Sequence, residues 1–282
     1  MATTQTAPEM KYTVIDSRSR DGLRMLLAEL WQYRELIYFL VWRDVMVRYK
    51  QTVLGLMWAV LQPLIIALTL SLFLGRLAHL SSDGLPYPVF AYSAMILWQL
   101  FSQALTGASN SMLENERLVT KSYFPRLVIP IAAVLASLLD FAVALVVLVG
   151  FLAWFRVAVS WTLLLLPCFV LLTVVIASGV GFLLAALNVR YRDVRYTLAF
   201  LVQFWFLATP IAYSSSVVPQ RFRFWYGLNP MVGVVEAFRW SLRGAGPAPL
   251  VLLAISCAVA LLLLLIGLAY FQHAENTFAD TI

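Results

Sequence analysis

Residues able to do acid–base, nucleophilic or metal chemistry are few and scattered in this sequence. The two histidines, His79 and His273, are far apart, and the two cysteines, Cys168 and Cys257, lie within apolar runs. None of the 13 glycines begins the G-x-x-x-x-G-K-S/T pattern that holds nucleotide phosphates. The H-E-x-x-H and G-x-S-x-G patterns of hydrolases are also absent. We therefore expect no bound metal, no cofactor, no disulfide scaffold, no catalytic residue and no ATP hydrolysis by this chain alone.

One ionisable residue is unusual because of its surroundings. Asp140 lies in the apolar stretch LASLLDFAVAL. A carboxyl group at membrane depth is costly and by default marks a pathway, a partner or a proton relay. No lysine or arginine lies near the centre of a predicted membrane helix to pair with it, so a protonated or hydrogen-bonded structural aspartate is an equally good interpretation. The sequence leaves its role open.

The composition indicates which elements must position these residues. Of 282 residues, 62% are apolar and 12% are charged, against about half and about a quarter in soluble domains. Residues 1–20 are polar and lack the apolar core of a signal peptide, so we expect a flexible cytosolic N-terminus. We interpret the net charge of +6 as membrane topology and expect no nucleic acid partner.

Six apolar stretches approach the length of about 20 residues that a helix needs to cross about 30 Å of hydrocarbon. The least apolar of the six, 197–217, has a more polar end, and Pro210 is expected to kink it or end it early. We predict an all-α membrane protein whose six-span permease domain occupies residues 51–282. The predicted spans are about 54–75, 87–107, 128–153, 162–187, 197–217 and 249–271.

The basic residues orient these spans. With both termini in the cytosol, 14 of the 20 lysines and arginines lie on the cytosolic side, which is the bias that membrane proteins show. The six on the external side are Arg76, Arg156, Arg221, Arg223, Arg239 and Arg243.

Four of those six lie in the external segment 219–245, which is predicted to be more than a loop. Asn229-Pro230 is a helix start and Arg243-Gly244 a helix stop. The helix between them is too short to cross, so we expect a re-entrant helix, with a surface helix as the alternative. Glu236 and Arg239 share one face and are expected to neutralise each other.

Two cytosolic regions are predicted to contact other molecules. Residues 21–50 form an amphipathic helix along the membrane that ends in the charged cluster RDVMVRYK. Segments 109–125 and 188–195 carry mixed charge and are too short to fold alone, so whatever drives this protein must be another chain.

Aromatic and amide side chains recur in the first, second and fifth predicted spans. Aromatic faces stack on sugar rings and amides bond hydroxyl groups, which is the mixture that a passage for a glycan needs, although each aromatic residue taken alone is more simply explained by packing. They are Trp58, Gln62, Trp98, Gln99, Phe101, Gln103, Gln203, Phe204, Trp205, Phe206 and Tyr213.

Four motifs in order and a C-terminal tail make the sequence recognisable. The run WRDVMVRYKQTVLGLMWAVLQPL, from Trp42 to Leu64, resembles the start of the ABC type-2 permeases that export polysaccharides. The later matches are FPRLVIP at 124–130, NVRYRDVRY at 188–196 with ATPIAY at 208–213, LNPMVGVVEAFRWSL at 228–242, and the tail FQHAENTFADTI.

The resemblance implies a homodimer in the bacterial inner membrane, with two copies of an ABC ATPase that bind ATP and Mg on the cytosolic face. It implies that 21–50 is the interface helix, that 109–125 is the segment coupled to the ATPase, and that 219–245 is the external gate. The implied coupling residues are Glu114, Glu116, Arg117, Arg192 and Asp193, and the implied gate residues are Asn229, Pro230, Glu236 and Arg239.

The implied cargo is a glycan of O-antigen or capsular type on undecaprenyl pyrophosphate or another lipid carrier. Cationic groups near the membrane boundary, including the external arginines, would then meet the anionic headgroup. The expected headgroup residues are Arg43, Arg48 and Lys50, and the expected glycan path is Trp58, Gln62, Phe204, Trp205 and Tyr213.

Three other functions stay open. The same machinery would suit a drug, a lipid or a teichoic acid polymer. A membrane enzyme of lipid-linked sugars would need external acidic or histidine residues, for which Asp83 and Glu236 are too isolated. An ATP-independent carrier is supported by Asp140 alone.

Overall fold

The computed structural model describes residues 28–50, 55, 57–121, 124–158, 160–191, 193–275 and 278. Every regular element within these ranges is a helix, as predicted. The expected flexible N-terminus 1–20 and the first part of the expected interface helix, residues 21–27, lie outside the described residues.

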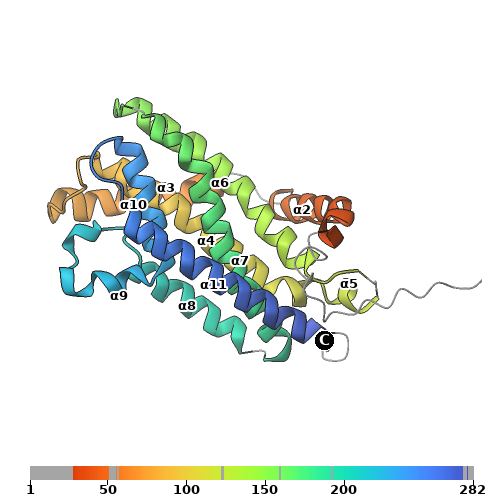
Figure 1. Cartoon of the computed structure of the whole chain (residues 1–282). Helices are drawn as coiled ribbons and strands as arrows, with labels where there is room; N and C mark the ends of the chain where they lie inside the picture. Colours follow the sequence, from red (N-terminus) through yellow and green to blue (C-terminus); the bar gives the residue numbers. More distant parts are fainter. Residues whose placement is uncertain are drawn as a thin grey trace, which may run out of the picture.

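The helices pack side by side in a bundle, and short turns connect most of them (Figure 1). α2 lies beside α6 at one end of the bundle, near α5 and the C-terminal end of α11, whereas α9 and α10 lie toward the other end (Figure 1). The longer elements are α2 (Arg34–Tyr49), α3 (Met57–Leu70) continued by the π-helical η1 (Ser71–Leu77), α4 (Tyr87–Glu114), α6 (Val128–Trp154), α7 (Leu166–Arg190), α8 (Val194–Ala208), α10 (Pro230–Arg243) and α11 (Leu250–Glu275). The shorter ones are α5 (Glu116–Lys121), η2 (Trp161–Leu165), η3 (Ser215–Val217), η4 (Gln220–Phe222) and α9 (Arg223–Gly227).

Four helical stretches within the described ranges are long and apolar enough to cross a membrane. They are Met57–Leu77, Val128–Trp154, Trp161–Arg190 and Leu250–Glu275. They correspond to four of the six predicted spans. Their length and composition therefore agree with the predicted multi-pass membrane protein.

The two other predicted spans differ from these four in ways that the packing explains. α4 has 28 residues and is buried along most of its length, between α6, α7 and α3. A helix shielded from lipid by its neighbours tolerates polar side chains such as Gln99, Gln103 and Ser109, which lower its hydropathy.

α8 corrects the prediction for residues 197–217. It ends at Ala208, and Thr209 is extended with φ −101° and ψ 140°. The residue before a proline is driven out of the helical region by the proline ring, and Pro210 follows. The expected helix is therefore wrong in its last part, and the 15 residues of α8 span only about 22 Å.

Two apolar clusters hold the bundle together. The larger is built on α4 and its contacts with α6, α7 and α10. The second joins Leu40 of α2 and Val119 of α5 to Val128 of α6, Phe182 of α7 and Phe271 of α11. This second cluster therefore connects the short outer helices to the membrane helices at one end of the molecule.

Close packing of α7 on α11 depends on two glycines. A Cβ atom at Gly179 would lie 2.6 Å from backbone atoms of Leu263 and Leu264, and one at Gly267 would overlap the backbone of Gly179. Membrane helices that approach this closely use small residues because their stability comes from van der Waals contact with no hydrophobic driving force between them.

We expect Gly179→Ala to destabilise the protein by about 1–3 kcal/mol, because the methyl group must push α7 and α11 apart. Gly150→Ala in α6 is the matched control, since nothing lies within 4 Å of a Cβ atom there. The measurement is the thermal unfolding midpoint of the detergent-solubilised protein. Equal midpoints for the two variants would show that the α7–α11 contact is not this tight.

Candidate functional site

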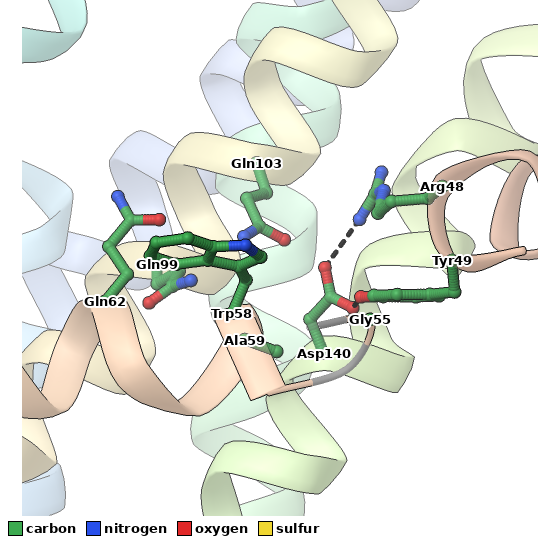
Figure 2. A pocket seen from close by; sticks show the side chains of 9 residues that line it. All are labelled: Arg48, Tyr49, Gly55, Trp58, Ala59, Gln62, Gln99, Gln103 and Asp140. Carbon is green, nitrogen blue, oxygen red and sulfur yellow. Dashed lines mark hydrogen bonds and ion pairs between the residues drawn. The ribbon is translucent and has the colours of Figure 1, made fainter. Parts of the chain in front are cut away.

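The central feature of the candidate site is an ion pair between the end of α2 and the middle of α6. Arg48 donates a hydrogen bond to Asp140 Oδ2 at 2.5 Å, and the hydroxyl of Tyr49 donates to Asp140 Oδ1 (Figure 2). The Asp140 side chain is 5% exposed and the Arg48 side chain 39%. Asp140 therefore has a cationic partner, which comes from the end of α2 and not from the centre of a predicted span, and the interpretation of a hydrogen-bonded structural aspartate fits this geometry.

A pocket of about 220 Å³ opens beside this pair. α2 contributes Arg48 and Tyr49, and α6 contributes Asp140. Trp58 and Gln62 of α3 lie across from them, with the Gln99 and Gln103 side chains reaching in from α4 (Figure 2). The predicted headgroup residue Arg48 and the predicted glycan residues Trp58 and Gln62 thus line one pocket.

A second pocket of about 390 Å³ shares Arg48 with the first and lies between α2, α4 and α6. Its other polar lining residues include Arg43, Asp44, Ser111 and Glu114. The two pockets together extend from Glu114 at the end of α4 to Gln99 in its middle, and residues of α2 line both of them.

The other two predicted headgroup residues are placed differently. Arg43 forms an ion pair with its neighbour Asp44 at 2.7 Å, so its charge is partly neutralised. Lys50 is exposed one residue after α2 ends. Among the described residues, Arg48 is thus the one of the three with a partner in another helix.

The rest of the predicted glycan path forms a separate group around α8. The Trp205 ring packs against Phe101 of α4 with centroids 4.9 Å apart, and Phe204 is 62% exposed. Tyr213 accepts a hydrogen bond from the Tyr226 hydroxyl at 3.2 Å. Burial raises the pKa of Tyr226, and the bond to Tyr213 raises it further, so this hydroxyl keeps its proton.

The start and the end of α10 are confirmed. Asn229 caps the helix by accepting a hydrogen bond from the Met231 backbone at 3.1 Å, and Pro230 is the first helical residue. The helix ends at Gly244, whose φ of 65° is the left-handed conformation that a glycine adopts readily.

Asn229 also ties α10 to the end of α8. Its Oδ1 accepts from Trp205 Nε1 at 2.8 Å, and its Nδ2 donates to the backbone oxygen of Ala208 at 3.1 Å. The same amide reaches the Thr209 hydroxyl at 3.1 Å. The residue that the sequence predicts to start α10 is therefore also a connection between two helices.

Arg239 of α10 is a buried charge with a full set of acceptors. Its side chain is 2% exposed and lies 3.7 Å from Glu236, which confirms that these two residues pair. Its guanidinium also lies over the Phe90 ring at 3.4 Å from the centroid. It donates to the backbone oxygens of Phe90 (3.2 and 3.3 Å), Pro210 (2.6 Å), Ile211 (2.8 Å) and Tyr213 (3.3 Å).

This geometry explains the presence of one of the four arginines in segment 219–245. Arg239 joins α4, the turn after α8 and α10, and an anionic headgroup has no access to it in this structure. α10 itself is buried on nearly all its residues against α11, α7 and α4, so it is not a surface helix.

The predicted coupling residues lie at the end of the bundle where α2, α5 and the end of α11 gather. Glu114, Glu116, Arg117 and Asp193 are exposed, and Arg192 lies outside the described residues. Asn188, near the end of α7, donates to the Ser109 backbone at 3.0 Å and to Asn110 Oδ1 at 3.2 Å. The two predicted coupling segments are therefore linked by side-chain hydrogen bonds.

Comparison with known proteins identifies the family. The family described as ABC-2 type transporter matches residues 35–242. The chain belongs to the ABC-2 type transporter family. Its four long apolar helices agree with a multi-pass membrane permease. An ABC-2 permease is the transmembrane subunit of its transporter and not the ATPase, so this chain implies a partner ABC ATPase.

Three relatives match almost end to end. The O-antigen export system permease protein RfbA of Myxococcus xanthus is 28% identical over 263 residues, covering 91% of this chain and 99% of that protein. RfbA of Klebsiella pneumoniae is 26% identical over 250 residues, covering 88% and 95%. The polysialic acid transport protein KpsM of Escherichia coli is 24% identical over 248 residues, covering 83% and 91%.

Sequence reasoning missed how this ABC-2 permease fixes its charges. Tyr49 was not singled out, and Arg48 and Asp140 were considered separately, because 92 residues separate them and no local pattern relates them. Gln99 and Gln103 were noted only as part of a polar surface. Their spacing of four residues places them on one face of α4, which was a usable signal.

Arg239→Gln should prevent normal folding or lower the thermal midpoint sharply, because it removes a charge-assisted donor from four backbone carbonyls and leaves Glu236 buried without its partner. The expected cost is at least about 3 kcal/mol. Arg221→Gln, at an exposed arginine of the same segment 219–245, is the control. Normal stability of Arg239→Gln together with lost transport would instead indicate a direct role in transport.

Asp140→Asn should loosen the end of α2, since the amide keeps a hydrogen-bond acceptor for Tyr49 but loses the ion pair with Arg48. We expect trypsin to cleave at Arg43, Arg48 or Lys50 severalfold faster in detergent. Asp83→Asn, whose carboxylate bonds the Ser214 hydroxyl at the other end of the molecule, is the control. Unchanged cleavage of Asp140→Asn would mean that the apolar contacts of α2 alone hold it.

Proposed function

We propose that this chain is the channel-forming subunit of an exporter that moves a lipid-linked polysaccharide, of O-antigen or capsular type, across the bacterial inner membrane. Two copies would form the passage, with two copies of an ABC ATPase on the cytosolic face. The observation that supports this most directly is the polar surface that runs past Arg48 in an ABC-2 permease whose relatives are named for O-antigen export and polysialic acid transport.

The chemistry of that surface fits an amphiphile with an anionic headgroup and a glycan. Arg48 supplies a guanidinium that is partly exposed, and diphosphate oxygens are good bidentate acceptors for such a group. Amides and an indole continue the surface inward, where hydroxyl groups and sugar faces find partners. Exposed apolar residues of α2, among them Phe39 and Trp42, would keep the lipid part in contact with the membrane.

The topology that goes with this proposal has six spans and both termini in the cytosol. α4 and α8 would be the second and fifth spans, with α8 completed by the turn 209–217. α9 and α10 would form the external gate. The side-chain hydrogen bonds of Asn229 would transmit movement between that gate and α8.

Movement of the ATPase would reach the membrane helices through their packing contacts. An ATPase docked on α5 and on the turn before α8 would push against the apolar cluster that joins α2, α5, α6, α7 and α11. Because α2 is held to α6 through Arg48 and Asp140, the same displacement would act on the polar pocket.

The experiment is export in cells that lack the gene and carry variants of it. Deletion should make a lipid-linked polymer accumulate inside the cell, and chemical analysis of that polymer distinguishes O-antigen and capsule from teichoic acid. Arg48→Gln combined with Lys50→Gln should lower surface polymer at least about tenfold, since two cationic contacts each contribute more than about 1 kcal/mol.

Two variants control this test. Arg48→Lys keeps the charge and should restore part of the export, and Arg34→Gln, at the exposed start of α2, should leave export unchanged. Wild-type export by a normally expressed Arg48→Gln, Lys50→Gln protein would contradict the headgroup role. Failure of the chain to purify with any P-loop ATPase would contradict the exporter.

A further inference from the structure

Two buried amide oxygens beside the Arg48–Asp140 pair have no hydrogen-bond partner among the described residues. Gln99 Oε1 and Gln103 Oε1 are both shielded from solvent, and neither accepts a hydrogen bond in the part of the chain that the structure describes. The Gln99 residue as a whole is 9% exposed. Both side chains line the pocket of about 220 Å³ (Figure 2).

Leaving these acceptors unpaired is costly. A buried polar atom without a hydrogen bond loses the free energy of its hydration, and nearly all such atoms in folded proteins have a partner. Methionine or leucine would fill the same space on α4 without this penalty. Within the described residues, the stability of the fold therefore does not explain the two glutamines, and donors from a bound ligand would satisfy them.

The pocket lies near the middle of the helices that form it. Asp140 is the twelfth residue after Val128, the start of α6, which places it about 18 Å along that helix. Gln103 is eleven residues before Glu114, the end of α4, or about 17 Å along it from the same end of the bundle. A polar group in the ligand must therefore travel well past the outer charges to reach these amides.

Size and lining indicate the class of ligand. The volume is below the roughly 300–1,000 Å³ of pockets for drug-sized molecules, so it suits one ring and not an oligosaccharide. Trp58 supplies an aromatic face, the two amides supply acceptors, and Arg48 supplies a cation at the rim. A hydroxylated ring attached directly to a phosphate or diphosphate satisfies all three.

We propose that this pocket binds the sugar ring next to the diphosphate of the exported lipid, with ring hydroxyls donating to Gln99 Oε1 and Gln103 Oε1. Trp58 stacks on the ring and Arg48 contacts the diphosphate beside it. This site rests on the proposed function, and it adds that the transporter recognises the first sugar as well as the anionic headgroup.

The test compares two probes on the purified permease–ATPase complex in nanodiscs. One probe is a polyprenyl diphosphate carrying a single N-acetylhexosamine, and the other is the same lipid diphosphate without sugar. Affinity is measured by displacement of a fluorescent polyprenyl diphosphate. The wild-type complex should bind the sugar-bearing probe about tenfold more tightly.

Substitution of the amides should remove this preference. Gln99→Met and Gln103→Met should each reduce it about threefold, and the double variant should abolish it, while the affinity for the sugar-free probe stays the same. Thermal midpoints should be unchanged or higher, because an unpaired acceptor has been removed. Gln272→Met, at an exposed position near the end of α11, is the matched control and should keep the preference.

The outcomes separate the two proposals. Equal affinity of the wild-type complex for both probes, or a full preference in the double variant, would overturn the sugar site and leave headgroup binding intact. A lower thermal midpoint in the methionine variants would show that the amides are structural and would also overturn it. If neither probe displaced the fluorescent lipid, that result would contradict the proposed function itself.

Discussion

The buried guanidinium of Arg239 holds together the end of the molecule that contains α9 and α10. In an apolar medium a charge is stable only if donors and acceptors surround it, and a chain that leaves its helical path must satisfy its own backbone. Pro210 ends α8 and frees the carbonyls of the residues that follow, and Arg239 binds three of them together with Phe90 of α4. A break in α8 and a charge in α10 thus compensate each other.

The Arg48–Asp140 pair, near the middle of α6, solves a related problem in a different way. Arg239 is enclosed and has several acceptors, whereas Arg48 has one carboxylate partner and is more than a third exposed. A guanidinium held on one side only can bind a second anion without leaving the first. We infer that Arg239 fixes the architecture, and that Arg48 combines attachment of α2 with contact to a ligand.

How much the sequence predicts depends on whether the determinant is local. Asn229, Pro230 and Gly244 act on the residues beside them, so both ends of α10 were predictable. Pro210 signalled that the preceding helix ends early, although the predicted span still ran on to residue 217. The partners of Asp140 and Arg239 lie far away in the chain and are chosen by how helices pack, which glycines such as Gly179 determine. Which residues form such pairs can be read only from the three-dimensional arrangement of the helices.

The contrast between satisfied charges and unsatisfied amides separates stability from function within one bundle. The chain provides carbonyls for every donor nitrogen of Arg239 and a carboxylate for Arg48, yet the residues that the structure describes offer no donor to the Gln99 and Gln103 oxygens. Natural sequences break the rule of polar satisfaction mainly where a ligand completes it. Because both amides lie on the face of α4 that Arg48 approaches, the positions that weaken the isolated fold are the ones that a phosphorylated sugar would reach.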